Sequence, residues 1–280
     1  MPAPAPPPSP ETVELQQLLN VTNGDAPLPT DGLLNEDTVR EVKIFQATHT
    51  DLKGNPLTVD GDAGPATMGA LRAAATGNPG APPPVPQYGG TVGHQIARIG
   101  MAEYRSKVIE EAKGKVLNTN TGVRVREFQD ATGLTGTGWP WCAAFVTWCY
   151  EQADLLLQDE AGFASVDLLK NWAVAKDGKT VRCGKSRADW TCKVFWKTRT
   201  KKKPYRAPPG AIVIYSYGHT GVVVQGMDNV DYTVEGNTSG GDSGSQRDGG
   251  GVYLRTRTHG LITGYVVLDA ILTAGPPATK

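Results

Sequence analysis

Cys142 is the residue of this chain best placed to act as a nucleophile. It follows the Gly/Pro-marked turn Gly138-Trp139-Pro140-Trp141 and opens an apolar, helix-like run that continues to Trp148. A cysteine at a helix N-terminus meets unpaired backbone N–H groups and the positive end of the helix dipole, which stabilise a thiolate and can hold a developing oxyanion. The ordinary alternative is a small, buried hydrophobic residue. The surrounding sequence favours nucleophilic chemistry.

His219 is the histidine best placed to serve as the base for that thiol. It lies between two short β-branched runs, in a segment typical of a hairpin or a strand edge. Gly218 and Gly221 stand close on either side and are expected to leave room for a substrate. His259 is the second candidate, but no acid or amide pair follows it in the sequence.

A further strand is predicted over residues 230–237. Glu235 and Asn237 share one of its faces, because alternate residues of a strand point the same way. Either side chain could accept the second ring N–H of His219 and fix the orientation of the imidazole. The three segments together predict a nucleophile, a base and an orienting group.

These segments resemble the CHAP family, the cysteine, histidine-dependent amidohydrolases and peptidases of bacterial cell-wall metabolism. The resemblance lies in three motifs in the family's order: Trp141-Cys142-Ala143-Ala144-Phe145-Val146, Gly218-His219-Thr220-Gly221-Val222-Val223 and Glu235-Gly236-Asn237-Thr238. It implies Cys142 as nucleophile, His219 as base, Glu235 as orienter and Asn237 as a supporting polar group. One departure is Gly210-Ala211, where members commonly have Gly-Asp before the histidine strand.

The resemblance covers residues 91–280 and implies an α+β fold. It predicts a papain-like (NlpC/P60-like) domain, with helices packed on an antiparallel sheet, that hydrolyses an amide bond of peptidoglycan as an amidase or an endopeptidase. No cofactor and no metal are implied. Aromatic residues near the motifs are expected to bind substrate in a groove, with burial in the core as the alternative. They are Trp139, Trp141, Tyr217 and Trp172.

A smaller helical domain is predicted over residues 11–76, with a disordered tail over 1–10 and a Pro/Gly-rich linker over 77–90. Its apolar residues have helical spacing and indicate three short helices. A weak internal repeat places an Asp-Gly turn before two of them, at Asp31-Gly32 and Asp60-Gly61. The segment resembles the three-helix peptidoglycan-binding domain. The alternative is an accessory bundle that binds no ligand.

The cysteines and a glycine-rich run allow further expectations. The chain has no Cys-x-x-Cys pair, which argues against a metal site, and Cys149 is expected to serve packing. Cys183 and Cys192 flank a loop that a disulfide could close, or they are two buried free thiols. The Gly/Ser/Asp-rich run 240–251 lacks the acidic spacing of a calcium loop and is predicted to form a hairpin loop at the rim of the site.

Composition limits the partners. The chain has 28 basic and 28 acidic residues, but residues 91–280 are net basic, which favours attraction to an anionic cell envelope or reflects a solvated loop. No nucleic-acid motif and no membrane-spanning run are present. We expect a monomer that binds bacterial peptidoglycan. The resemblance, with no apparent export signal, suggests a phage endolysin made in the host cytoplasm, or equally a virion-borne lysin. The rival functions are an inactive wall-binding protein and a cysteine amidase for a small soluble amide.

Overall fold

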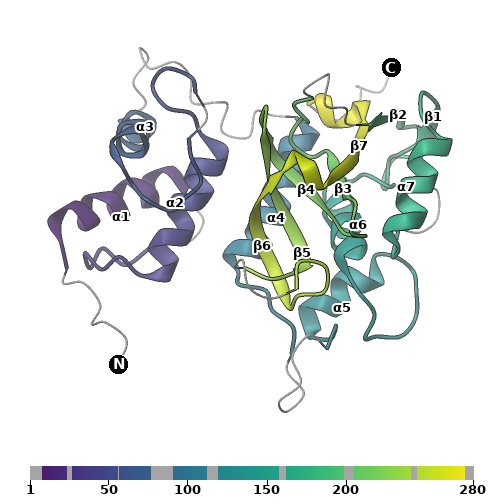
Figure 1. Ribbon diagram of the computed structural model, residues 1–280, viewed down its shortest axis with the longest axis horizontal. Coiled ribbons are helices and arrows are strands. Elements are labelled where there is room, and N and C mark those ends of the chain that lie inside the picture. The colour runs from purple at the N-terminus through teal and green to yellow at the C-terminus, as the bar shows by residue number, and fades with distance from the viewer. Residues whose placement is uncertain are drawn as a thin grey trace. The chain divides into compact units, whose positions relative to one another are not determined.

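The chain forms two compact units, residues 1–89 and 90–280, and each is described here by itself. The structure is a computed structural model that describes residues 8–23, 27–55, 57–76, 91–111, 119–157, 162–198, 205–240 and 245–274. Figure 1 shows the helices of the first unit and the helices and sheet of the second.

The first unit holds three helices among its described residues: α1 Pro10–Asn23, α2 Glu36–Thr48 and α3 Pro65–Thr76. Their apolar residues meet in one core, in which Leu19, Phe45 and Leu71 are almost completely buried. Asn35 caps α2 by accepting a hydrogen bond from the backbone N–H of Thr38 at 2.9 Å. The apolar residues with helical spacing in the sequence are therefore the residues that form the core of this unit.

The weak internal repeat of the sequence is a structural repeat. The side-chain amide of Gln16 on α1 donates to Asp31 at 2.9 Å, and its oxygen accepts from the backbone N–H of Gly32 at 2.9 Å. Gly32 has φ +74°, a conformation that favours glycine. The second turn repeats both bonds, at 2.8 and 2.9 Å, with Gln46, Asp60 and Gly61. Each turn is thus fixed by a glutamine of the preceding helix.

The second unit is built on one antiparallel sheet of seven strands among the described residues, in the order β1-β2-β7-β3-β4-β5-β6 (Figure 1). The strands are β1 Thr180–Arg182, β2 Thr191–Thr198, β3 Ile212–Tyr215, β4 Thr220–Gly226, β5 Val230–Thr238, β6 Gly251–Thr258 and β7 Ile262–Leu268. The helices are α4 Val92–Arg105, α5 Val123–Asp130, α6 Cys142–Gln152 and α7 Val166–Ala175, with the 3-10 turns η1 His259–Leu261 and η2 Asp269–Leu272. The predicted α+β class is confirmed.

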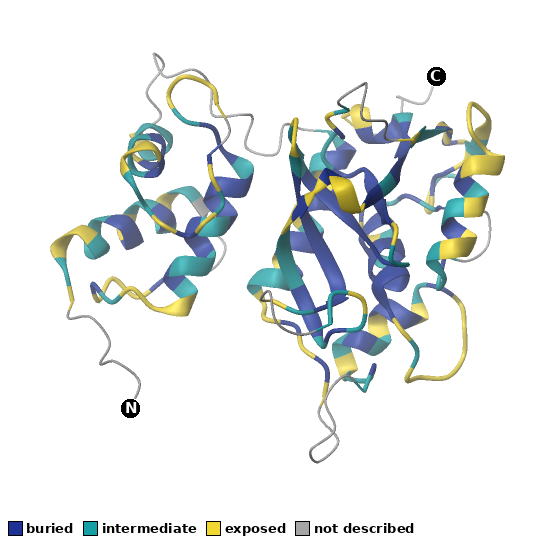
Figure 2. Cartoon of the chain, viewed as in Figure 1, coloured by how far each residue is buried: buried dark blue, intermediate teal, exposed yellow. Residues whose placement is uncertain are grey.

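Helix α6 is the central helix of this unit. It contacts strands β4 and β5 and also helices α4, α5 and α7. Its residues from Cys142 to Thr147 are all buried, as expected for a helix that is apolar on every side. Figure 2 shows the same burial over the central strands. The helix that begins with Cys142 is therefore held firmly in the core.

Gly236 on β5 lets this strand approach α6 closely. A Cβ atom at residue 236 would lie 2.6 Å from the ring of Trp141 and 2.7 Å from Phe145. No side chain fits there without moving the start of α6. The glycine between Glu235 and Asn237 thus sets the distance between the strand and the helix.

The four cysteines are buried and free. Cys183 and Cys192 lie close to each other across the β1–β2 hairpin, where Val181 pairs with Cys192. Of the two alternatives for Cys183 and Cys192, the structure therefore shows two buried free thiols and no disulfide.

No helix in the described ranges combines the length and apolar character needed to cross a membrane.

Candidate active site

Cys142 is the first residue of helix α6. The residue before it, Trp141, caps the helix without a side-chain hydrogen bond. The first N–H groups of a helix have no intrahelical partner, so they remain available beside the thiol. Only 5% of Cys142 is exposed, and this part faces a groove. The thiol is therefore sheltered, reachable and close to hydrogen-bond donors.

His219 lies between β3 and β4 and is completely buried. Its ring atom Nε2 is 3.1 Å from Oε2 of Glu235. The other ring nitrogen, Nδ1, has no hydrogen bond to any residue that the structure describes, although Cys142 is close enough to affect the pKa of the ring. The imidazole thus stands between the carboxylate on one side and the thiol on the other.

Glu235 is held by a network that the sequence did not reveal. Its Oε1 accepts hydrogen bonds from Tyr215 and Thr233, both at 2.7 Å, and from Nε of Arg257 at 2.8 Å. A second guanidinium nitrogen of Arg257 donates to Oε2. Glu235 is wholly buried and Arg257 nearly so, which makes this a buried bidentate ion pair.

The network keeps Glu235 ionised. Burial raises the pKa of the carboxyl group, but the hydrogen bonds from Arg257 and His219 and their positive charges outweigh this effect. The result is a pKa of about 2, below the ordinary value of 4.5. An anionic carboxylate behind the ring favours the imidazolium form of His219.

The pKa of His219 is raised, whereas that of Glu235 is lowered. Burial lowers its pKa, but the negative charge of the nearby Cys142 thiolate and the interaction with Glu235 raise it to about 9, from the ordinary 6.5. The imidazolium form therefore persists at neutral pH. Its contribution to stability is present below the unfolded value of 6.5 and is lost as the pH rises through about 9.

We expect the hydrolysis rate to fall as the pH rises through about 9, because the neutral ring can no longer give a proton to the leaving amine. Initial rates measured from pH 5 to pH 10 would show this alkaline limb. Glu235→Gln should move the limb to lower pH, since the neutral amide no longer stabilises the imidazolium. A limb at the same pH in both proteins would contradict the role of Glu235.

Asn237 lies on the same strand but does not contact His219. In the amide orientation that satisfies its neighbours, its nitrogen donates to Asp248 at 3.1 Å and its oxygen accepts from the backbone N–H of Trp141 at 3.2 Å. Asn237 has φ +58°, at a register shift in the β5–β6 pairing. Of the two candidates for the partner of His219, Glu235 is the one that contacts the ring. Asn237 instead contacts the backbone of the turn before Cys142.

The two glycines near His219 differ in what they make room for. A Cβ atom at Gly221 would lie 2.6 Å from Cγ of Glu235, so this space is filled by the carboxylate side chain. Gly218 has φ +77° and faces the groove. Gly221 thus makes room for Glu235, so the expectation that it leaves room for a substrate is wrong, whereas Gly218 borders the groove.

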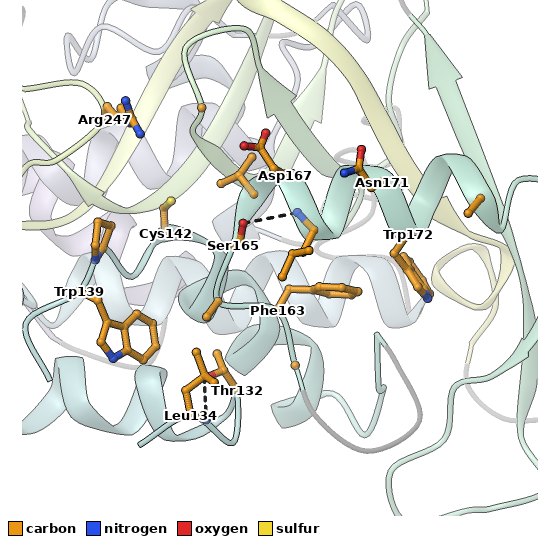
Figure 3. Close-up of a pocket in the computed structure, with 17 residues that line it drawn as sticks. Thr132, Leu134, Trp139, Cys142, Phe163, Ser165, Asp167, Asn171, Trp172 and Arg247 are labelled. Atoms are coloured by element: carbon orange, nitrogen blue, oxygen red, sulfur yellow. Dashed lines mark hydrogen bonds between the residues drawn. The ribbon is translucent and has the colours of Figure 1, made fainter. Parts of the chain in front are cut away.

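A groove of about 900 Å³ opens beside Cys142 (Figure 3). Trp139 and Trp172 line it, as do Phe163 and several residues at the start of α7. Its volume lies within the range of ordinary ligand-binding pockets, about 300–1,000 Å³. Arg247 also lines the groove and belongs to the run 240–251 predicted at the rim of the site, whereas no sequence pattern pointed to Phe163.

Two of the predicted substrate contacts are placed elsewhere. Trp141 is completely buried, and its Nε1 donates to Glu110 at 2.8 Å, so the prediction that it binds substrate is wrong. The ring packs under α6 against Phe128. Tyr217 is half-buried and does not line the groove; its ring stacks on that of His219, with centroids 6.0 Å apart.

A thiol at a helix N-terminus, an imidazole on the adjacent sheet and a carboxylate behind the ring define a cysteine hydrolase of the papain-like kind. Residues 134–237 match the family model of the CHAP domain, and this segment contains Cys142, His219, Glu235 and Asn237. This part of the chain is therefore a CHAP domain, the catalytic domain of cysteine, histidine-dependent amidohydrolases and peptidases. Comparison with curated proteins and with solved structures gave no match.

Proposed function

We propose that this protein hydrolyses an amide bond of bacterial peptidoglycan, with Cys142 as nucleophile, His219 as acid and base, and Glu235 as the group that orients the ring. The observation that carries the proposal is the buried imidazole held between Glu235 and the thiol beside an open groove. The CHAP match over residues 134–237 favours a wall substrate over a small soluble amide.

The reaction proceeds in two halves. The thiolate of Cys142 attacks the carbonyl carbon of the amide, and the free N–H groups at the start of α6 hold the oxyanion. Protonated His219 gives its proton to the leaving nitrogen, so an amine departs and a thioester remains. Neutral His219 then takes a proton from water, whose oxygen attacks the thioester. The carboxylate product leaves, and the Cys142 thiolate and the His219 imidazolium are restored.

Asn237 supports this chemistry indirectly. Its hydrogen bond to the backbone N–H of Trp141 fixes the turn from which Cys142 emerges. Its other bond, to Asp248, ties the same strand to the loop beside the groove. Asn237 is thus a positioning residue, and it touches neither the thiol nor the ring.

The first unit is proposed to bind the wall. Its second Asp-Gly turn and the start of α3 form a depression of about 340 Å³ that includes Asp60, Thr67 and Gln46. A binding unit joined to a hydrolase raises the local concentration of the active site on its polymer. This arrangement suits a phage endolysin that reaches the wall from inside the host once the membrane is open, and equally a lysin carried by the virion.

The test is digestion of purified bacterial walls by the full chain, followed by mass spectrometry of the released fragments. New amine and carboxylate ends in equal amounts are expected, and their position identifies the bond. Hydrolysis of small amides without any release from walls would favour the soluble amidase instead. Binding to walls without turnover of either substrate would favour the inactive wall-binding protein.

A further inference from the structure

Arg247 lies beside the nucleophile and the loop that carries His219. It lines the same groove as Cys142 and Gly218, and Figure 3 shows its side chain at the groove near Cys142. A Cβ atom on Gly218 would be 3.6 Å from Nε of Arg247, so the guanidinium rests against the bare backbone of that glycine. The side chain is exposed and makes no hydrogen bond or ion pair with any residue that the structure describes.

The segment that carries Arg247 is fixed on both sides of it. The side-chain oxygen of Gln246 accepts from Arg255 at 2.6 Å and from Arg257 at 2.8 Å, and Arg257 in turn holds Glu235. The backbone oxygen of Gln246 accepts from the Thr238 hydroxyl at 3.2 Å. The loop is thus anchored to the strand of the orienting carboxylate.

The other flank of Arg247 is anchored to the same strand. The side chain of Asp248 accepts from the side-chain amide of Asn237, and the backbone N–H of Gly249 donates to the backbone oxygen of Asn237 at 3.0 Å. The position of Arg247 is therefore set by groups that also set Glu235 and the turn before Cys142. Because the backbone is anchored on both sides of Arg247, the side chain stays at the groove and loses less freedom when it binds a ligand.

The charges of the groove are few. Apart from Cys142, its ionisable lining residues are Arg247 and Asp167, among the residues that the structure describes. Asp167 belongs to the first turn of α7, whereas Arg247 belongs to the loop between β5 and β6. The remaining lining is largely apolar and aromatic. The groove therefore carries a positive charge on the β5–β6 loop and a negative charge on α7.

We propose that Arg247 binds a carboxylate of the substrate close to the scissile amide, so that anionic peptide segments are the preferred substrates. This inference rests on the proposed peptide hydrolysis and specifies its substrate class. The planar guanidinium can bind a carboxylate through two parallel hydrogen bonds, which an amide at the same position cannot match. Repulsion by Asp167 directs the carboxylate toward Arg247 and sets the direction in which the peptide lies.

The experiment compares two forms of one substrate. A wall fragment that the parent protein cleaves is used as isolated and after conversion of its carboxylates to carboxamides. We measure kcat/KM for the parent, Arg247→Gln and Arg247→Lys. The matched control is Arg182→Gln, which makes the same charge change at an exposed residue of β1.

The parent should prefer the carboxylate form by about tenfold, the usual size of one charge-assisted contact that solvent partly screens. In Arg247→Gln, kcat/KM should fall on the carboxylate form and stay unchanged on the carboxamide form, so the preference disappears. Arg247→Lys should keep part of the preference. Arg182→Gln should behave as the parent. Equal rates of the parent on both forms, or an equal loss on both forms in Arg247→Gln, would overturn the inference.

Binding separates this inference from the proposed function. Calorimetry with Cys142→Ala, with and without Arg247→Gln, measures the affinity for the two fragments without turnover. Tighter binding of the carboxylate form that is lost in Arg247→Gln supports the inference, whether or not the parent cleaves the fragment. Failure of the parent to cleave it would count against the proposed function only. The absence of such a preference overturns the inference.

Discussion

Replacing Cys142 by alanine should abolish hydrolysis of bacterial walls and leave wall binding intact. The substitution removes the nucleophile, and the N–H groups at the start of α6 and the groove cannot supply another one. Loss of a nucleophile from a linked catalytic set typically costs a thousandfold or more in kcat, on the order of 10⁶ in a comparable serine enzyme. Release of new amine ends from walls measures the activity, and sedimentation with walls measures the binding.

Cys149→Ala is the matched control for this experiment. It removes a thiol from the same helix, at a residue whose sulfur packs against Gly100 in the core. We expect a small loss of stability, on the order of 1 kcal/mol, and retained hydrolysis. Wall hydrolysis by Cys142→Ala at the rate of the parent would show that the mechanism is wrong.

Replacing Arg257 by methionine should give the largest loss of stability of any single change at the site. It leaves the wholly buried carboxylate of Glu235 without its bidentate partner, and removing one member of a buried ion pair typically costs about 3–5 kcal/mol. The rate should fall as well, because Glu235 would gain a proton more readily and orient His219 less firmly. Urea unfolding followed by tryptophan fluorescence measures the stability.

Fluorescence is well suited to this measurement because all six tryptophans lie between residues 139 and 196, in the second unit. The double variant Arg257→Met, Glu235→Gln is the matched control. Removing both charges should restore much of the lost stability but not the rate, since His219 still lacks its carboxylate. A change below about 1 kcal/mol in Arg257→Met alone would contradict a structural role for the pair.

The parts of the site that the sequence predicts are those that depend on short, local patterns. A turn followed by an apolar run places Cys142 at a helix start, and strand alternation places Glu235 and Asn237 on one face. These features follow from neighbouring residues. The fold class follows as well, because β-branched runs between turns specify strands.

Arg257 could not be predicted in this way. It lies opposite Asp231 in the β5–β6 register and reaches along the strand to Glu235. Register shifts interrupt the β4–β5 pairing between Val223 and Gln225, and the β5–β6 pairing between Glu235 and Thr238. Pairing across strands depends on such bulges, which no local pattern in the sequence specifies. The alternation of Arg255 and Arg257 in β6 was the only available signal, and by itself it indicates an exposed strand face.

The tryptophans show a second limit. Trp139 lines the groove, whereas Trp141 is buried, although they are two residues apart beside the same nucleophile. Residue type cannot distinguish the two positions, because an aromatic ring suits both a ligand groove and a buried core. What separates them is Gly236, which lets β5 lie against the ring of Trp141.

The paired glutamine turns of the first unit indicate a tandem duplication. Gln46 follows Gln16 by 46 − 16 = 30 residues, and Asp60 follows Asp31 by 60 − 31 = 29. Each helix therefore fixes the turn that follows it by the same two bonds, although the three helices share one core. The second of these turns borders the depression proposed to bind the wall, so a substitution of Gln46 would disturb that depression and leave the first turn with both of its own bonds.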